Sequence, residues 1–192
     1  HIDGLSLAYC DFRFEDESGN PVDLPWTWRV KIDEGDPLAD VALNWQHEII
    51  IPPCCFLFDS RFFTEYGIRE DETIRANEDY DLLLSVLALK PRIVFQDQVM
   101  AAYRITPGSV SKNQARLRAT YLHIIDKHLK AFAGDARMTD ILRRKKLLVK
   151  RDFWQYSPPY EIGWWLYRLR WAARRVLPSR LYTRLKRLLI RS

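Results

Sequence analysis

The sequence has no apolar run of 18 residues, roughly the length at which a stretch becomes a candidate for crossing a bilayer as a helix. It shows no secretory signal, and it has only three cysteines. An odd count, with Cys54 and Cys55 adjacent, is not a disulfide framework. We therefore expect neither a membrane-spanning nor a disulfide-stapled protein, and the cysteine usage fits a reducing compartment.

Several nucleotide and metal signatures are also missing. There is no Gly-x-Gly-x-x-Gly and no phosphate-loop lysine motif. His123 and His128 are off the i, i+4 spacing that places two ligands on one face of a helix. We therefore expect no metal site among the histidines.

The charge is unevenly distributed along the 192 residues. The segment 162–192 contains nine Lys and Arg but no Asp or Glu, whereas acids outnumber bases before it. Apolar residues make up 47 %, enough to bury a core. An acidic body with a basic tail indicates that the tail has an anionic partner of its own.

Strands and helices mix in the front part of the chain, and only helices are expected after it. Apolar runs bounded by turn residues predict strands, and apolar residues at a 3.6-residue period predict helices. We place the boundary near Ser111, with an α/β region over 1–111 and a helical region over 112–192. The expected strands are 6–14, 48–51, 54–58, 92–95 and 99–105, and the expected helices are 37–46, 60–66, 78–89, 117–132, 138–154, 162–177 and 179–190.

The most informative stretch is NEDYDLLL, residues 77–84. It opens the helix expected over 78–89, with Asn77 as a candidate N-cap. Acids in a first turn complement the positive end of the helix dipole, and this alone accounts for them. On that interpretation Asp81 is a surface acid.

The segments before and after residues 77–84 indicate a role for these acids beyond helix capping. An apolar strand and the segment FFTEYG (62–67) precede it, and two strands ending in YRITPGSVS (103–111) follow it. Over roughly 7–111, this order closely resembles the family 2 glycosyltransferases, which are inverting enzymes of the GT-A fold. In that family, a strand and a short helix ending in Gly precede a Glu-Asp motif, and a strand then leads to a Tyr-Arg element and a serine-containing loop. The resemblance implies the second half of a GT-A type sheet flanked by helices, followed by an all-helical C-terminal region.

The resemblance also implies an activity, the transfer of a sugar from a nucleotide-diphosphate sugar to an acceptor hydroxyl with inversion. A carboxylate must take the hydroxyl proton as the new bond forms. The second acid of the family motif has this role, and here it is Asp79. Neighbours on a helix point about 100° apart, so Glu78 is expected to orient a nearby loop instead.

Donor binding is expected at the end of the last strand. By resemblance, Arg104 and the loop from Thr106 to Ser111 lie over the diphosphate, with Ser109 as a further donor. An Arg fork fits phosphate oxygens. Many relatives have a His in this loop, where this chain has Ile105 and Thr106.

A larger departure concerns the metal. The family binds Mg²⁺ or Mn²⁺ through an Asp-x-Asp or Asp-Asp element before the strand that matches 7–14, and His1-Ile2-Asp3-Gly4 is not that motif. We therefore expect the metal ligands and the nucleotide half to lie outside this chain, and the chain alone to be inactive. The alternative is a catalytically inactive, membrane-associated binding or scaffold module.

A glycoside hydrolase needs two carboxyls facing each other across the bond, roughly 5 to 9.5 Å apart, whereas Glu78 and Asp79 are sequential neighbours. Cys54 and Cys55 are expected to be inert core cysteines, since buried free cysteine is common.

The tail over 162–192 carries Trp and Tyr residues, then separate stripes of Leu and Arg after Pro178. Such a helix is typical of a membrane interface. We expect an anionic membrane surface as its partner, no nucleic acid, and a cytoplasmic protein on the inner face of the membrane. A saccharide or lipid-linked acceptor, in cell-surface polysaccharide or glycolipid assembly, fits that setting by analogy.

Overall fold

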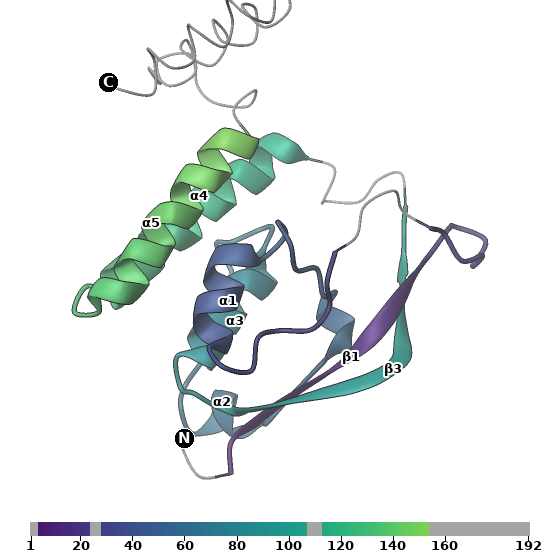
Figure 1. Cartoon of the computed structure of the whole chain (residues 1–192), viewed down its shortest axis with the longest axis horizontal. Coiled ribbons are helices and arrows are strands. Elements are labelled where there is room, and N and C mark those ends of the chain that lie inside the picture. The colour runs from purple at the N-terminus through teal and green to yellow at the C-terminus, as the bar shows by residue number, and fades with distance from the viewer. Residues whose placement is uncertain (1–3, 24–27, 107–112, 154–192) are drawn as a thin grey trace, which may run out of the picture.

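A computed structural model describes residues 4–23, 28–106 and 113–153. Within them a three-stranded mixed sheet is flanked by helices (Figure 1). In chain order the elements are β1 (Ser6–Glu15), α1 (Pro37–Asn44), the 3-10 turn η1 (Pro53–Cys55), β2 (Phe56–Phe58), α2 (Arg61–Thr64), α3 (Glu78–Leu87), β3 (Arg92–Arg104), α4 (Gln114–Ala131) and α5 (Ala136–Asp152).

The sheet has the order β2-β1-β3, so the first strand lies in the middle. β1 pairs antiparallel with the short β2 and parallel with the long β3. The β1–β3 register shifts on either side of Asp11, which is an irregularity of the β-bulge kind. β3 is one continuous strand, where the sequence predicted two.

The inner face of the sheet packs against α1 and α3. Leu7 and Tyr9 of β1 are fully buried there, because side chains two apart on a strand point to one face. The Tyr9 hydroxyl accepts a hydrogen bond from the backbone N–H of Ile32 at 2.7 Å and thereby holds the loop before α1. The core therefore starts at the central strand and continues into the helices.

The helices α4 and α5 form an antiparallel pair that packs on α1 and α3, on the side away from the sheet (Figure 1). Each begins at a side-chain cap: Asn113 accepts from the N–H of Arg116, and Asp135 accepts from that of Met138. Buried hydrophobic residues of both helices, such as Tyr121 and Ile124 of α4 and Leu142 of α5, belong to the same hydrophobic cluster as the sheet. The proposed boundary at 111 falls among residues outside the described ones.

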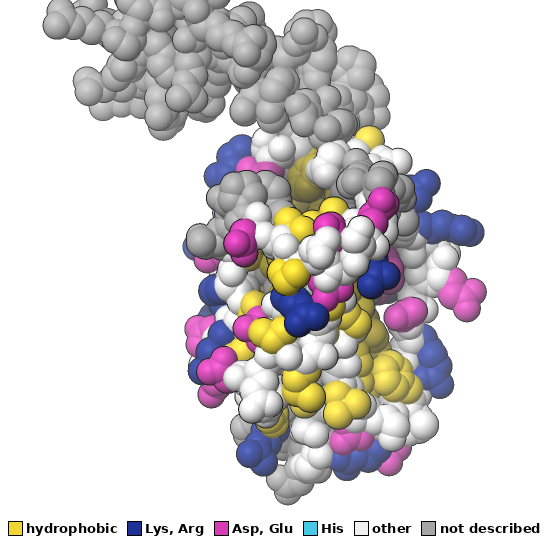
Figure 2. All heavy atoms as spheres, turned by 90° about the vertical axis from the view of Figure 1, so that its right-hand side faces the viewer, with side chains coloured by type: hydrophobic (Ala, Val, Ile, Leu, Met, Phe, Trp, Pro, Cys, Tyr) yellow, Lys and Arg dark blue, Asp and Glu magenta, His cyan; other side chains and the backbone are white. Residues whose placement is uncertain are grey.

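The outer face of the sheet carries no described helix. Leu57, Ala8 and Val94 form one row across the three strands, and Leu57 is 73 % exposed. Figure 2 shows hydrophobic side chains on the side of the molecule where β3 lies. The strand predicted over 54–58 was expected to be buried and is only partly so, because Cys54 and Leu57 are exposed and Leu57 points to this open side.

Most predicted elements that fall on described residues agree with the structure, with one further difference. The predicted strand over 48–51 has only isolated bridges at Ile49. α2 is a single short turn, after which Gly67 has a positive φ, as expected for the residue that ends a helix. The helices predicted over 162–177 and 179–190 lie outside the described residues.

Candidate functional site

The Glu-Asp pair lies at the N-terminus of α3, as the sequence predicted. Glu78 is exposed, whereas Asp79 is partly buried. The Oδ1 atom of Asp79 accepts a hydrogen bond from the N–H of Tyr80 at 2.8 Å. One N–H of the first turn of α3 thus bonds the Asp79 carboxylate, whereas the Glu78 carboxylate is exposed to water.

The environment of Asp79 holds its proton unusually tightly. Burial raises the pKa of Asp79 to about 6, while the N–H of Tyr80 lowers it and the charge of Glu78 raises it. None of the described cations pairs with Asp79. A carboxylate whose pKa lies this close to neutrality can both accept and return a proton near physiological pH.

Asn77 occupies the N-cap position of α3 but does not cap it. Its φ is +58°, in the left-handed region that Asn tolerates better than most residues. Its side-chain nitrogen instead bonds α4, at the hydroxyl of Thr120 and the carbonyl of Leu117. The predicted capping hydrogen bond is therefore wrong, and the start of α3 is held by α4.

Beneath this helix lies a buried lysine between two aromatic rings. The Lys145 Nζ lies 5.8 Å from the ring centre of Tyr80 and 5.4 Å from that of Tyr121, and it donates to the carbonyl of Trp45. Burial lowers the pKa of Lys145 to about 7, against the opposing charge of Asp152. Lys145 is therefore only partly charged near neutral pH.

Tyr121 connects this cluster to Asp79. Burial raises the pKa of the Tyr121 hydroxyl well above its usual value, and the charge of Asp79 raises it further. The buried hydroxyl of Tyr121 and the side-chain oxygen of Asn77 have no hydrogen-bond partner among the described residues. Two unsatisfied buried polar atoms around the start of α3 are unusual and need an explanation.

Asp81 is not the surface acid that the sequence predicted. Its side chain is buried, and its two oxygens bond His128 Nε2 at 2.8 Å and Lys127 Nζ at 2.7 Å. Burial alone would raise the pKa of Asp81, but these two partners outweigh it and the pKa is lowered. Asp81 therefore joins α3 to α4, and among the acids in the first turn of α3 it leaves Asp79 partly buried without a described counter-ion.

The predicted diphosphate residues are described only in part. Arg104 ends β3, is exposed, and lies 3.8 Å from a carboxylate oxygen of Glu15. Thr106 is exposed just beyond it, and Ser109 and Ser111 lie outside the described residues. The structure therefore places Arg104 beside an acid and leaves the loop that follows it undescribed.

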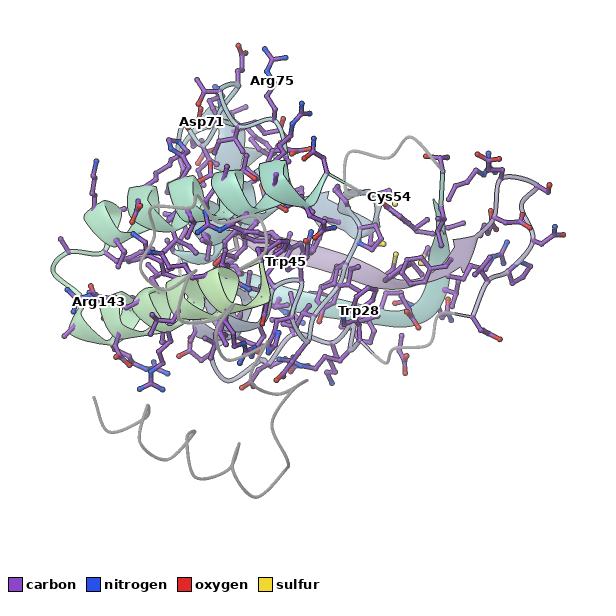
Figure 3. The ribbon with its side chains drawn as sticks, turned by 90° about the horizontal axis from the view of Figure 1, so that it is seen from above. Trp28, Trp45, Cys54, Asp71, Arg75 and Arg143 are labelled. Atoms are coloured by element: carbon purple, nitrogen blue, oxygen red, sulfur yellow. The ribbon has the colours of Figure 1, made fainter. Side chains whose placement is uncertain are left out.

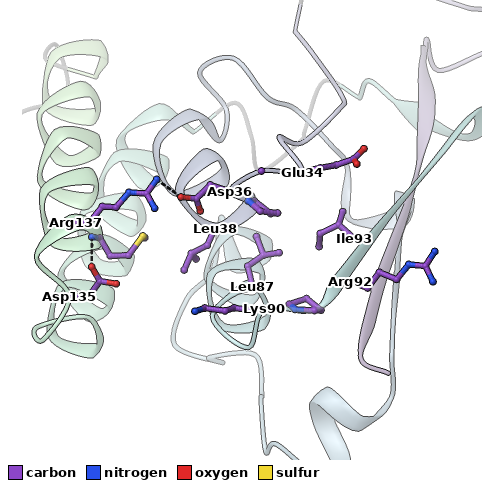
Figure 4. A pocket seen from close by; sticks show the side chains of 13 residues that line it. Glu34, Asp36, Leu38, Leu87, Lys90, Arg92, Ile93, Asp135 and Arg137 are labelled. Carbon is purple, nitrogen blue, oxygen red and sulfur yellow. Dashed lines mark hydrogen bonds and ion pairs between the residues drawn. The ribbon is translucent and has the colours of Figure 1, made fainter. Parts of the chain in front are cut away.

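One pocket of about 630 Å³ lies at the opposite end of α3 (Figure 4). It lies between the C-terminal end of α3 and the starts of α1, α5 and β3, and the close-up shows the ion pair of Arg137 and Asp36. Asp79 does not line it. The pocket and the Glu-Asp pair are therefore separate features.

Cys54 and Cys55 differ from the predicted core pair. Cys55 is buried, but Cys54 is exposed, and both are free thiols (Figure 3). Across the described ranges, no group of three or more His, Cys, Asp and Glu residues is arranged to hold a metal ion. Within those same ranges, no helix is long and apolar enough to cross a membrane.

Comparison of the chain with protein-family models, with curated proteins and with solved structures finds no match.

Proposed function

We propose that the chain is the acceptor-side half of an inverting, nucleotide-sugar-dependent glycosyltransferase of the GT-A type, with Asp79 as its base. The observation that carries this proposal is the state of Asp79: partly buried, without a described counter-ion, with a pKa of about 6. A carboxylate held in this way costs stability, and such costs cluster at functional sites. The order of motifs from 62–67 to 103–111, which resembles that of the family 2 glycosyltransferases, supports sugar transfer as the proposed reaction.

In this mechanism the acceptor hydroxyl donates a hydrogen bond to the Asp79 carboxylate and transfers its proton as the oxygen attacks the anomeric carbon. The raised pKa strengthens Asp79 as a base while leaving it mostly ionised at pH 7. Glu78, exposed one position earlier, orients a neighbouring loop.

Fewer of the residues proposed for donor binding lie in the described part of the chain. Arg104, Thr106, Ser109 and Ser111 are proposed to bind the diphosphate of the nucleotide sugar. Arg104 would exchange its contact with Glu15 for phosphate oxygens. Since the described residues offer no ligand set for Mg²⁺ or Mn²⁺, the metal expected in the intact enzyme is assigned no ligand here.

The proposal extends to the setting of the enzyme. The basic segment 162–192 would hold it on the inner, anionic face of a membrane, where a saccharide or lipid-linked acceptor is available. Nucleic acid is not a proposed partner.

The test is Asp79→Asn in the intact enzyme. The amide keeps the size of the carboxylate but cannot accept the proton, so transfer should fall about 10²- to 10⁴-fold. Calorimetric affinity for the nucleotide sugar should be unchanged. Asp97→Asn, at an exposed position on β3, is the matched control and should transfer normally. Transfer by Asp79→Asn at the control rate would reject the assignment.

A further inference from the structure

The three cysteines of the chain meet at the edge where β1 and β2 separate. The last registered pair of these strands is Tyr9 with Phe56, so the next positions across the ladder are Cys10 and Cys55. Directly opposed residues of antiparallel strands have Cα atoms about 4.5–5.5 Å apart. Disulfides join Cα atoms about 4.4–6.8 Å apart, so Cys10 and Cys55 are placed for cross-linking.

The turn η1 brings the third thiol to the same place. Cys54 immediately precedes Cys55 in η1, and the thiols of Cys54 and Cys10 both lie close enough to the Cys55 thiol to raise its pKa. Figure 3 labels Cys54 at this position beside the sheet. A buried thiol therefore has a neighbouring thiol on each of two segments.

The three thiols differ in access to solvent. Cys54 is exposed, Cys10 is partly buried and Cys55 is buried. Burial, together with the two neighbouring thiols, raises the pKa of Cys55 far above its usual value. Because the thiolate is the reactive form, an oxidant dissolved in water should react first at Cys54 and not at Cys55.

We propose that Cys54, Cys55 and Cys10 form an oxidation site at which a peroxide reacts with Cys54 and the stable product is a Cys10–Cys55 disulfide. The site is independent of the proposed transfer reaction. The three sulfurs are not arranged as a metal site, and a bond between the adjacent Cys54 and Cys55 serves only as an intermediate.

Each step balances. The Cys54 thiolate attacks one peroxide oxygen and breaks the O–O bond, which gives a sulfenic acid and, after protonation, water. The Cys55 sulfur then attacks the Cys54 sulfur, its proton leaves with the hydroxyl as a second water, and a Cys54–Cys55 disulfide forms. The Cys10 sulfur attacks Cys55, loses its proton, and expels Cys54 as a thiolate. Two thiols are oxidised and one peroxide is reduced.

Peptide mapping of the full chain tests the proposal. The reduced protein is treated with hydrogen peroxide, its remaining thiols are alkylated, and it is digested with trypsin without reduction. Cys10 lies in the fragment 1–13, and Cys54 and Cys55 lie together in the fragment 32–61. The expected product is these two fragments joined, with the alkyl group on Cys54. Fragmentation in the mass spectrometer locates that group without any variant.

Two substitutions distinguish the cysteine that first reacts with peroxide from the cysteines that form the final disulfide. Cys54→Ser should still give the joined fragments, but on the order of tenfold more slowly, because the exposed thiol is gone. Cys55→Ser should not join the fragments at the original rate. Before oxidation, maleimide should modify Cys54 of the reduced chain first and Cys55 last.

The proposal is overturned by any of three results. The first is over-oxidation of Cys54 with fragments 1–13 and 32–61 left separate. The second is a joined pair in which Cys55, not Cys54, carries the alkyl group. The third is a cross-link between two chains as the main product at low protein concentration.

Discussion

The side chain of Asn77 is hydrogen-bonded to that of Thr120, with 2.9 Å between Nδ2 and Oγ1. This contact joins the start of α3 to α4 through two residues that are 43 positions apart in sequence, and Asn77 lies two positions before Asp79. The geometry of the proposed base therefore depends on α4 as well as on α3.

The first prediction follows from that contact and from the positive φ of Asn77. Asn77→Gly removes the two side-chain hydrogen bonds to Thr120 and Leu117 and should lower the free energy of unfolding by about 1–3 kcal/mol. Asn77→Ala removes the same bonds but keeps a Cβ in the left-handed region, where Ala is less favourable than Gly by roughly 1–2 kcal/mol. Urea denaturation of both variants measures the difference. Equal stability of the two would contradict the left-handed backbone at this position.

The second prediction concerns the pH dependence caused by Asp79. Its pKa in the folded state, about 6, is above that of an unfolded aspartate. Such a group lowers the free energy of unfolding as pH rises from about 4 to 6, by roughly 2 kcal/mol. Asp79→Asn should remove that decrease and make the protein more stable at pH 7.

Asp140→Asn is the matched control, because Asp140 pairs with Arg144 on the surface of α5. It should leave the pH profile nearly unchanged, as surface pairs contribute little. Carboxyl NMR of the isolated chain provides a direct measurement. An Asp79 that titrates near pH 4 would remove the main support for its assignment as the base.

The third prediction concerns Lys145, whose folded-state pKa of about 7 lies below that of an unfolded lysine. The unfolded chain binds more protons between about pH 7 and pH 10, so stability should rise with pH across this window. Lys145→Met should be more stable than the wild type at pH 6, by about 1–3 kcal/mol, and lose most of that advantage by pH 10. Thermal unfolding at both pH values tests this. Lys146→Met, at a neighbouring position paired with Asp126, is the control and should show no such crossover.

The fourth prediction concerns the segment 162–192, which lies outside the described residues. The chain should sediment with anionic vesicles, and removal of the segment should abolish this. Salt should weaken the binding without ending it, because screening acts on the charge contribution and not on the apolar one. Replacing Arg180, Arg184 and Arg187 by Glu should reduce binding more than replacing them by Gln. Equal sedimentation of the full and shortened chains would reject the membrane role.

The elements that the sequence predicted well are those whose signals are local. α1, α3 and α5 begin within two residues of their predicted starts. α1 and α5 have an Asp cap, α3 has acids in its first turn, and apolar residues recur at the helical period within each. Such signals depend only on residues within about one helical turn, so they can be recognised without knowing which distant segments pack against the helix.

The misread residues depend on partners far away in sequence. Asp81 is buried only because Lys127 and His128 reach it from α4. The burial of Lys145 could have been predicted from the sequence. At the helical period it falls on the same face of α5 as the buried residues Met138, Leu142 and Val149. Its chemistry was not predictable, since the two aromatic rings that enclose it come from α3 and α4.

The central position of β1 determines when the sheet can form during synthesis. Ser6 pairs in parallel with Arg92, so β1 must wait for most of the α/β region to be synthesised before its second neighbour exists. Long-range parallel pairing is intrinsically slow, and an unpaired strand edge on a nascent chain favours aggregation. Chains that end before Arg92 would present β1 with one edge permanently open. Ribosome stalling or proteolysis in the turn between α3 and β3 should therefore yield aggregates and not a smaller folded unit.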